Sequence, residues 1–242
     1  IAPPEKGITQ VSPTNTCQGT NINLNVAIGP YGAFQTFQWQ ASTTIGGTYA
    51  NVGNPKLTPD TTILADVTNY YRCAITCGGI TVYTDTVLVN VTPSLPTGTY
   101  TINAGAPISY VPGTAGGNFQ TFGATKAAMV CGITGAVTFN VVANSGPYNE
   151  QFILDSIAGT SVVKTITYNG TGNTIAFSST NSNERAVIKL NGADYITFDS
   201  LTIDSRGTGT FGYGIQLINN ADTNTFRKST ILVSETSTSA NF

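Results

Sequence analysis

The second half of the chain repeats a short pattern at an interval of 28 residues. The matched pairs are Ala193-Asp194 with Ala221-Asp222, Thr197-Phe198 with Thr225-Phe226, and Thr202-Ile203 with Thr230-Ile231. A repeat of about 20 to 50 residues is typical of stacked architectures, because a single unit cannot bury its apolar face alone. Since this repeat contains short β segments, we predict that it forms one coil of a right-handed parallel β-helix.

Short apolar segments separated by Asn, Gly and Ser turns occupy most of this half. They are 137–141, 152–154, 163–168, 174–177, 186–190, 195–198, 200–203, 214–218 and 229–233. Before them, an N-cap at Asn118, apolar residues at helical spacing and Gly132 just past the end predict one helix. We expect this helix to cap the β-helix at its N-terminal end. Because residues 234–242 close no obvious element, we expect an incomplete β-helix that continues in a longer protein.

The first part of the chain has a different rhythm, in which apolar and polar residues alternate. Ile22, Leu24, Val26 and Ile28 alternate with residues that are mostly Asn, as in a strand with one buried face. Further strands are predicted at 37–41, 71–77 and 82–91, and turn residues separate them at intervals typical of a β-sandwich. The predicted fold class is therefore all-β throughout.

Four residues in this part follow the immunoglobulin-like signature Cys, Trp, Tyr-x-Cys. They are Cys17, Trp39, Tyr71 and Cys73. Val26 occupies the position expected for the first Cys of the signature, and Cys17 precedes it by about nine residues. The signature therefore does not by itself predict the usual bridge across the sandwich. Cys73 and Cys77 lie ~13 Å apart on one strand and cannot pair.

We therefore predict a Cys17–Cys77 disulfide, with Cys17–Cys73 as the alternative. Cys131 lies in the other part of the chain and is left unpaired.

A proline-containing stretch at 92–98 separates the two parts. Its two prolines cannot donate to a β-ladder and favour extended neighbours. The predicted organisation is an Ig-like β-sandwich at 1–93, a linker at 94–98 and the β-helix at 99–242.

Charge and composition exclude several classes of partner. Charged residues make up only 9% of the 242 residues and the net charge is −2, so the chain has no basic stripe for nucleic acid. No apolar run approaches the ~18 residues of a membrane span, so membrane insertion is not expected. Low charge with abundant Thr, Asn, Ser and Gly favours an extracellular location, with the protein secreted and associated with the cell surface.

Three segments carry a resemblance to a known group of proteins. They are Cys17-Gln-Gly-Thr-Asn-Ile-Asn-Leu, Phe37-Gln-Trp-Gln and Asn69-Tyr-Tyr-Arg-Cys-Ala-Ile-Thr-Cys-Gly. Together they resemble the Ig-like repeats of large secreted Bacteroidota proteins, many of them exported by type IX secretion and including adhesins. The segment from Gly132 to Asp204 resembles the pectin-lyase-like β-helices of the same proteins. The resemblance implies one module of a long surface protein.

Nothing in the sequence predicts a cofactor or a metal. The chain has no His, and its Cys spacings do not match the close pairs of zinc sites. The residues that could serve a polysaccharide lyase or hydrolase are Asp194, Asp199, Asp204, Arg206 and Asp222. We interpret them as turn residues whose carboxylates accept from nearby backbone N–H groups, and we predict no catalytic residues.

Three functions are compatible with these features. We favour a non-catalytic adhesion or stalk segment that contacts surface glycans, other surface proteins or other copies of itself. The alternatives are a carbohydrate-active β-helix enzyme with an Ig-like accessory domain, and a structural protein of filaments or of a secretion assembly. Exposed loop aromatics could stack on sugars, and the candidates are Tyr31, Phe34, Tyr49, Phe211 and Tyr213.

Overall fold

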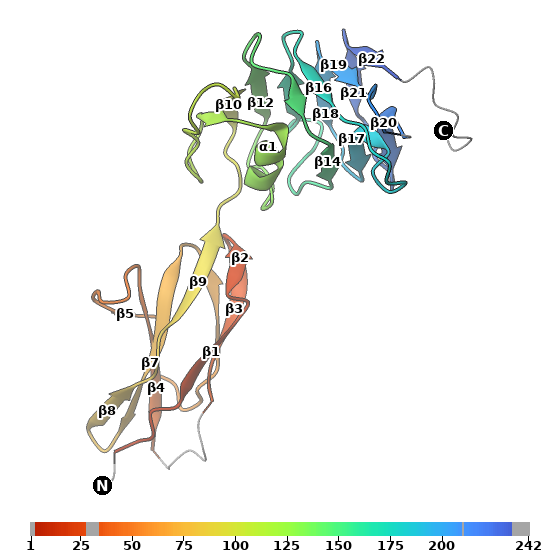
Figure 1. Cartoon of the computed structure of the whole chain (residues 1–242). Helices are drawn as coiled ribbons and strands as arrows, with labels where there is room; N and C mark the ends of the chain where they lie inside the picture. The colour runs from red at the N-terminus through yellow and green to blue at the C-terminus, as the bar shows by residue number, and fades with distance from the viewer. Residues whose placement is uncertain (1–2, 28–33, 210, 234–242) are drawn as a thin grey trace. The chain divides into compact units, whose positions relative to one another are not determined.

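The computed structural model (Figure 1) describes residues 3–27, 34–209 and 211–233. The chain divides into two compact units, Ile1–Pro93 and Ser94–Phe242. Almost all regular structure in both units is β, which confirms the predicted all-β class.

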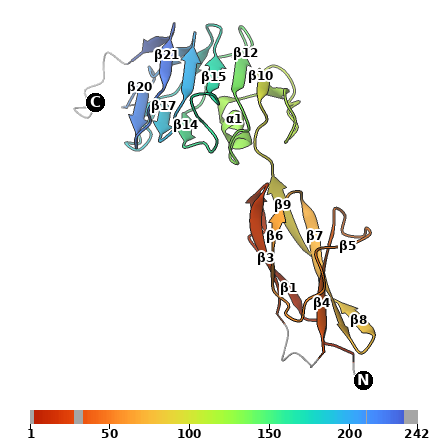
Figure 2. The same ribbon diagram turned by 180° about the vertical axis from the view of Figure 1, so that it is seen from behind.

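Unit 1 consists of two β-sheets. Its strands are β1 (Ile8–Ser12), β2 (Asn15–Cys17), β3 (Thr20–Ala27), β4 (Thr36–Ser42), β5 (Ala50–Asn51), β6 (Thr61–Ala65), β7 (Asn69–Cys77), β8 (Ile80–Tyr83) and β9 (Val87–Thr92). One sheet has the order β1-β3-β6, and the other has the order β2-β9-β7-β4-β5 with β8 also paired to β7. The pairs are antiparallel except β2 with β9. Figure 2 shows β9, β7 and β4 of the larger sheet from behind.

The apolar faces of both sheets form one core. Ile22, Leu24 and Val26 are buried on β3, as their alternation predicts, whereas Ile28 lies outside the described residues. Trp39 is buried on β4, and its indole N–H donates to the Pro59 carbonyl at 2.8 Å. Because a buried indole needs an acceptor, this bond lets the largest side chain of the unit enter the core.

The cysteines do not pair as predicted. Cys73 and Cys77 are free thiols, whereas Cys17 and Cys131 are disulfide-bonded. The predictions of Cys17–Cys77, of Cys17–Cys73 and of an unpaired Cys131 are therefore wrong.

Strand register gives the physical reason. Cys17 lies opposite Thr92, beyond the end of β9 that pairs with Asn69 of β7. Cys77 is at the other end of β7, eight residues further on, which is about 26 Å at the usual rise per residue. Even Cys73 is about 13 Å along the strand from Asn69, too far for a disulfide. Burial instead leaves Cys73 as a core thiol and raises its pKa to about 12.

Unit 2 is built from parallel strands that recur in order along the chain. They are β10 (Gly98–Ile102), β11 (Asn118–Phe119), β12 (Val137–Val141), β13 (Tyr148–Asn149), β14 (Phe152–Asp155), β15 (Ile166–Asn169), β16 (Thr174–Ala176), β17 (Ala186–Asn191), β18 (Ile196–Asp199), β19 (Thr202–Asp204), β20 (Tyr213–Ile218), β21 (Thr225–Arg227) and β22 (Thr230–Leu232). Sheet A has the order β11-β10-β12-β15-β18-β21, sheet B β13-β16-β19-β22 and sheet C β14-β17-β20.

The chain passes through sheets A, B and C in turn and then returns to A; we call each such passage a winding. The 28-residue repeat is confirmed in the register, since Thr197 lies opposite Thr225 and Thr202 lies opposite Thr230. Corner residues repeat in the same way. Tyr195 and Thr223 both have positive φ, at 62° and 57°, a left-handed conformation that is uncommon outside glycine.

Aromatic rings stack through the interior of unit 2. Register places one ring per winding in a single column, namely Tyr100, Phe139, Tyr168, Phe198 and Phe226. The last four rings stack with centroids 4.9 to 5.2 Å apart and interplanar angles of 10° to 17°. Tyr168 is fully buried, and its hydroxyl is hydrogen-bonded at 2.9 Å to Thr125, which satisfies the buried polar group.

The single helix among the described residues, α1 (Phe122–Ala128), is shorter than predicted. Asn118 is not its N-cap but starts β11, which pairs with β10, and Thr121 caps the helix instead. The carboxylate of Glu150 also accepts from the Phe122 and Gly123 backbone N–H groups, at 2.8 Å each. The ring of Phe122 enters the aromatic core. The first helical turn is therefore fixed by a residue of the next winding.

The predicted linker at 94–98 is part of unit 2. Leu95 is completely buried and exchanges backbone hydrogen bonds with Gly132 and Thr134, and β10 begins at Gly98. An apolar side chain in this stretch gains free energy by leaving water, so the segment docks on the neighbouring strands.

We predict that Phe198→Ala lowers the free energy of unfolding of unit 2 by about 3 to 5 kcal/mol, because it leaves a cavity in the ring column. Urea unfolding followed by circular dichroism measures the change. Trp39, the only Trp in the chain, reports unit 1 by fluorescence, and its transition should not move. The control Thr197→Ala, on the outer face of the same strand, should change stability by about 0.5 kcal/mol or less.

We also predict that a maleimide labels the half-buried Cys77 in the folded protein but labels Cys73 only after unfolding. The thiolate is the reactive form, and burial raises the pKa of Cys73 so that its thiol stays protonated. Burial also keeps the reagent away from the sulfur. Peptide mass mapping measures the labelling. Modification of Cys17 or Cys131 without a reductant would contradict the structure.

Candidate functional site

The outer face of sheet A carries a continuous row of threonines. Strand register aligns Thr99, Thr138, Thr167, Thr197 and Thr225, one from each of five adjacent strands. Neighbouring strands are about 4.8 Å apart, so the row presents hydroxyl and methyl groups at a constant interval. Their side chains are exposed or half-exposed, in contrast to the ring column on the inner face.

A second outer row on sheet A is held by hydrogen bonds between windings. It comprises Asn140, Asn169, Asp199 and Arg227. Asn169 donates to Asn140 at 3.3 Å, and Arg227 donates to Asp199 at 2.8 Å. The Ser200 hydroxyl and Arg227 both donate to the Asp199 carboxylate and hold its pKa below the usual range.

A third row starts on α1, crosses β14 and β17 of sheet C and ends just past β20, and its polar groups also satisfy one another. Lys126 of α1 pairs with Asp155, Asn191 donates to Asp155, and Asn219 donates to Asn191, at 2.8, 2.8 and 2.6 Å. The Lys126 ammonium, followed by the Asn191 amide, holds the pKa of Asp155 below its ordinary value. These rows bind successive windings to each other on their outer side.

The structure brings two of the acidic residues considered for catalysis together and holds the others with local partners. Asp194 accepts the backbone N–H of Asp222, in the next winding, at 2.6 Å. Asp204 accepts from the Arg206 backbone at 2.9 Å and from its guanidinium at 2.9 and 3.0 Å, which holds the pKa of Asp204 below its usual range. Asp199 lies on sheet A and Asp204 on sheet B, and the described residues contain no group of three His, Cys, Asp or Glu suited to a metal.

A polar hollow does lie beside Asp204. One part, of about 440 Å³, is lined by residues that include Asn149, Ala176 and Asp204. A second part, of about 270 Å³, is lined by Asn149, Ala176, Phe177, Ser178 and Arg206. Because the two parts share Asn149 and Ala176, they form one shallow groove, which places the Asp204–Arg206 pair at its edge.

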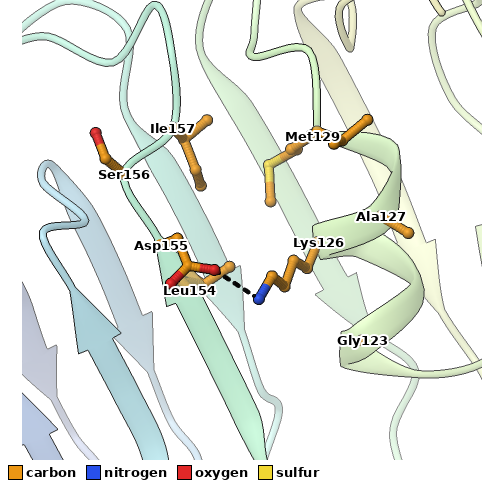
Figure 3. Close-up of a pocket in the computed structure, with 9 residues that line it drawn as sticks. Gly123, Lys126, Ala127, Met129, Leu154, Asp155, Ser156 and Ile157 are labelled. Atoms are coloured by element: carbon orange, nitrogen blue, oxygen red, sulfur yellow. Dashed lines mark hydrogen bonds and ion pairs between the residues drawn. The ribbon is translucent and has the colours of Figure 1, made fainter. Parts of the chain in front are cut away.

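An apolar hollow of about 300 Å³ lies between α1 and β14 (Figure 3). Met129, Leu154 and Ile157 contribute much of its lining, and the Lys126–Asp155 ion pair lies within it. Both charges of that pair are already matched, so the hollow offers a ligand little beyond apolar contact.

Unit 1 carries an arginine between two aromatic rings. The Arg72 guanidinium carbon lies 4.0 Å from the ring centroid of Tyr49 and 4.2 Å from that of Tyr83. Its Nε donates to Gln40 at 3.0 Å. Of the loop aromatics considered for sugar binding, Tyr49 belongs to this cluster, and Phe34 is 91% exposed. Phe211 instead lies under Arg185, Tyr213 starts β20, and Tyr31 lies outside the described residues.

The chain matches no family model, no curated protein and no solved structure. None of the helices in the described ranges is both long enough and apolar enough to cross a membrane.

Sequence reasoning missed the Arg72 cluster. It treated Tyr49 as an isolated loop aromatic and assigned no role to Arg72 or Tyr83. The three residues come from different strands and loops, so only the register of β7 with β4 and β8 reveals them together. The available signal was an arginine on the outer face of a strand whose alternate residues, Tyr71 and Cys73, are buried.

We predict that Asp155→Asn weakens the acid sensitivity of unit 2. The pKa of Asp155 is depressed in the folded state, so its stabilisation is present above the unfolded value and is lost as the pH falls through the folded value. The urea midpoint of the variant should therefore fall less between about pH 5 and about pH 2 than that of the parent protein. An equal loss in both proteins would contradict this role.

Proposed function

We propose that the chain is a non-catalytic segment of a large extracellular bacterial surface protein and serves adhesion or forms a stalk. In this proposal unit 1 is an Ig-like β-sandwich. Unit 2 is a right-handed parallel β-helix in which α1 covers an edge at the N-terminal end.

Packing and topology support the two fold assignments. In unit 1 the two sheets enclose Trp39, Tyr71 and Cys73, the residues expected in an Ig-like core. In unit 2 each winding adds one strand to each of up to three parallel sheets, which is the connectivity of a solenoid. α1 lies beside β14, one of the two edge strands of sheet C, where it covers an edge that would otherwise invite strand pairing (Figure 1).

The functional proposal rests on the difference between the side chains on the two faces of sheet A. The inner face is filled by a continuous ring column, and the outer face presents aligned polar rows to solvent. Such a surface can contact an extended partner at several equivalent points, so weak individual contacts add up. Asp199 and Asp204, by contrast, form ion pairs with Arg227 and Arg206 and lie on different sheets.

The low charge and the disulfide-bonded cysteines support an extracellular location, because disulfides persist in oxidising compartments. The sequence resemblance to surface proteins of Bacteroidota points the same way.

The groove beside Asp204 supports one alternative, a carbohydrate-active enzyme. It would need Asp204 as a proton donor or acceptor and Arg206 to polarise an anionic sugar. Against this, the carboxylate is bound to Arg206 by two side-chain hydrogen bonds, and its depressed pKa makes it a weak base.

The test is to incubate the full chain with a panel of plant, algal and bacterial polysaccharides and to score both retention and turnover. We expect retention of the chain on at least one polysaccharide or on bacterial cells, without new reducing ends or unsaturated products. Product formation that Asp204→Asn abolishes, while Asp155→Asn does not, would establish the enzyme instead. Absence of both retention and turnover would contradict a binding role.

A further inference from the structure

We propose that Arg72 of unit 1, held between Tyr49 and Tyr83, binds the carboxylate of an acidic saccharide. The site lies on the outer face of the larger sheet of unit 1, and Tyr49 is its one member among the loop aromatics considered from the sequence.

The two tyrosines fix the plane of the guanidinium. Tyr49 comes from the chain between β4 and β5, on one side of β7, and Tyr83 ends β8 on the other side. Two rings within about 4 Å of one carbon cannot share a face of the guanidinium, so they occupy both faces. Arg72 is half-buried and can offer a ligand only the edge that carries its N–H donors.

That edge lacks an anionic partner. Within the described part of the chain, ion pairs engage Lys6, Lys126, Arg206 and Arg227, but not Arg72. Its one hydrogen bond among the described residues uses Nε, toward Gln40, and leaves both terminal nitrogens without a protein acceptor. A planar guanidinium with two parallel donors matches a carboxylate, and prior ordering by the rings reduces the entropy lost on binding.

Neighbouring groups favour a saccharide over an acidic peptide. Gln40 passes the hydrogen-bond chain on, since its Nε2 donates to the Asn51 side-chain oxygen at 3.0 Å, which leaves the exposed Asn51 amide nitrogen as a donor for a hydroxyl. Tyr83 is 44% exposed, so the apolar surface of its ring can pack against the C–H face of a pyranose. A single uronate residue can therefore use its carboxylate, a hydroxyl and its C–H face at once on Arg72, Asn51 and Tyr83.

This inference rests on the proposed binding role and names a ligand class for it. The two can fail separately. If the chain is retained on polysaccharides and substitution of Arg72 does not change that retention, the binding role stands and this site is overturned. If the parent chain is retained on no polysaccharide, both the binding role and this site are contradicted.

The experiment is isothermal titration of the full chain with trigalacturonic acid. Arg72→Gln should weaken binding by about tenfold or more, because it removes charge-assisted hydrogen bonds. Arg72→Lys, which keeps the charge but loses the planar fork, should restore only part of the affinity. Tyr83→Ala should also weaken binding, because it removes one of the rings that order Arg72. Circular dichroism and Trp39 fluorescence verify that each variant is folded.

Matched controls separate this site from general charge attraction. Lys56→Gln removes one positive charge from the same unit and should leave the affinity unchanged, and the methyl ester of the same trisaccharide should not bind. The proposal is overturned if the parent protein does not bind trigalacturonic acid, if Arg72→Gln or Tyr83→Ala binds as the parent does, or if the ester binds equally. Equal affinity for tetraglutamate would assign the site to acidic peptides instead.

Discussion

In-register parallel pairing between successive windings is the constraint on which the structure of unit 2 depends. Parallel pairing places residues about 28 positions apart directly over one another. Each side chain must therefore pack against the side chain at the same position of the next winding, which is often of the same chemical type. Apolar positions meet this condition by stacking, as the rings of Tyr168 and Phe198 do. Polar positions meet it by side-chain hydrogen bonds between like residues, as Asn140 and Asn169 do.

The same constraint limits what the outer surface can do. Carboxylates directly over one another would repel, and the described residues instead place Asp199 over Asn169 and under Arg227. Asp155 likewise lies over Asn191 and beside Lys126. Asp155 and Asp199 are thereby each neutralised within their own row, which suits a stable contact surface better than proton transfer.

Unit 1 is not subject to this constraint. Each of its two sheets buries one face in the core and leaves the other face exposed. On the free face of β7, Arg72 is ordered by two rings and one amide rather than by a carboxylate. A charge kept in place without a counterion is available to a partner. The two units therefore offer two kinds of contact, a repetitive polar surface and a localised cationic edge.

The sequence by itself determined the all-β class, the alternation of Ile22, Leu24 and Val26, and the 28-residue register, because strand period and repeat length are local properties of the chain. Tertiary structure alone decided the rest. The cysteine partners depended on where β2 and β7 end, and the start of α1 depended on Glu150, 28 residues away. The site at Arg72 required strands distant in sequence to lie side by side. The cysteine partners and the Arg72 site join residues whose spacing along the chain carries no periodic signal, so a single sequence does not reveal them. Glu150 lies one repeat length from Phe122, but the repeat gives only the spacing and not which side chain caps the helix.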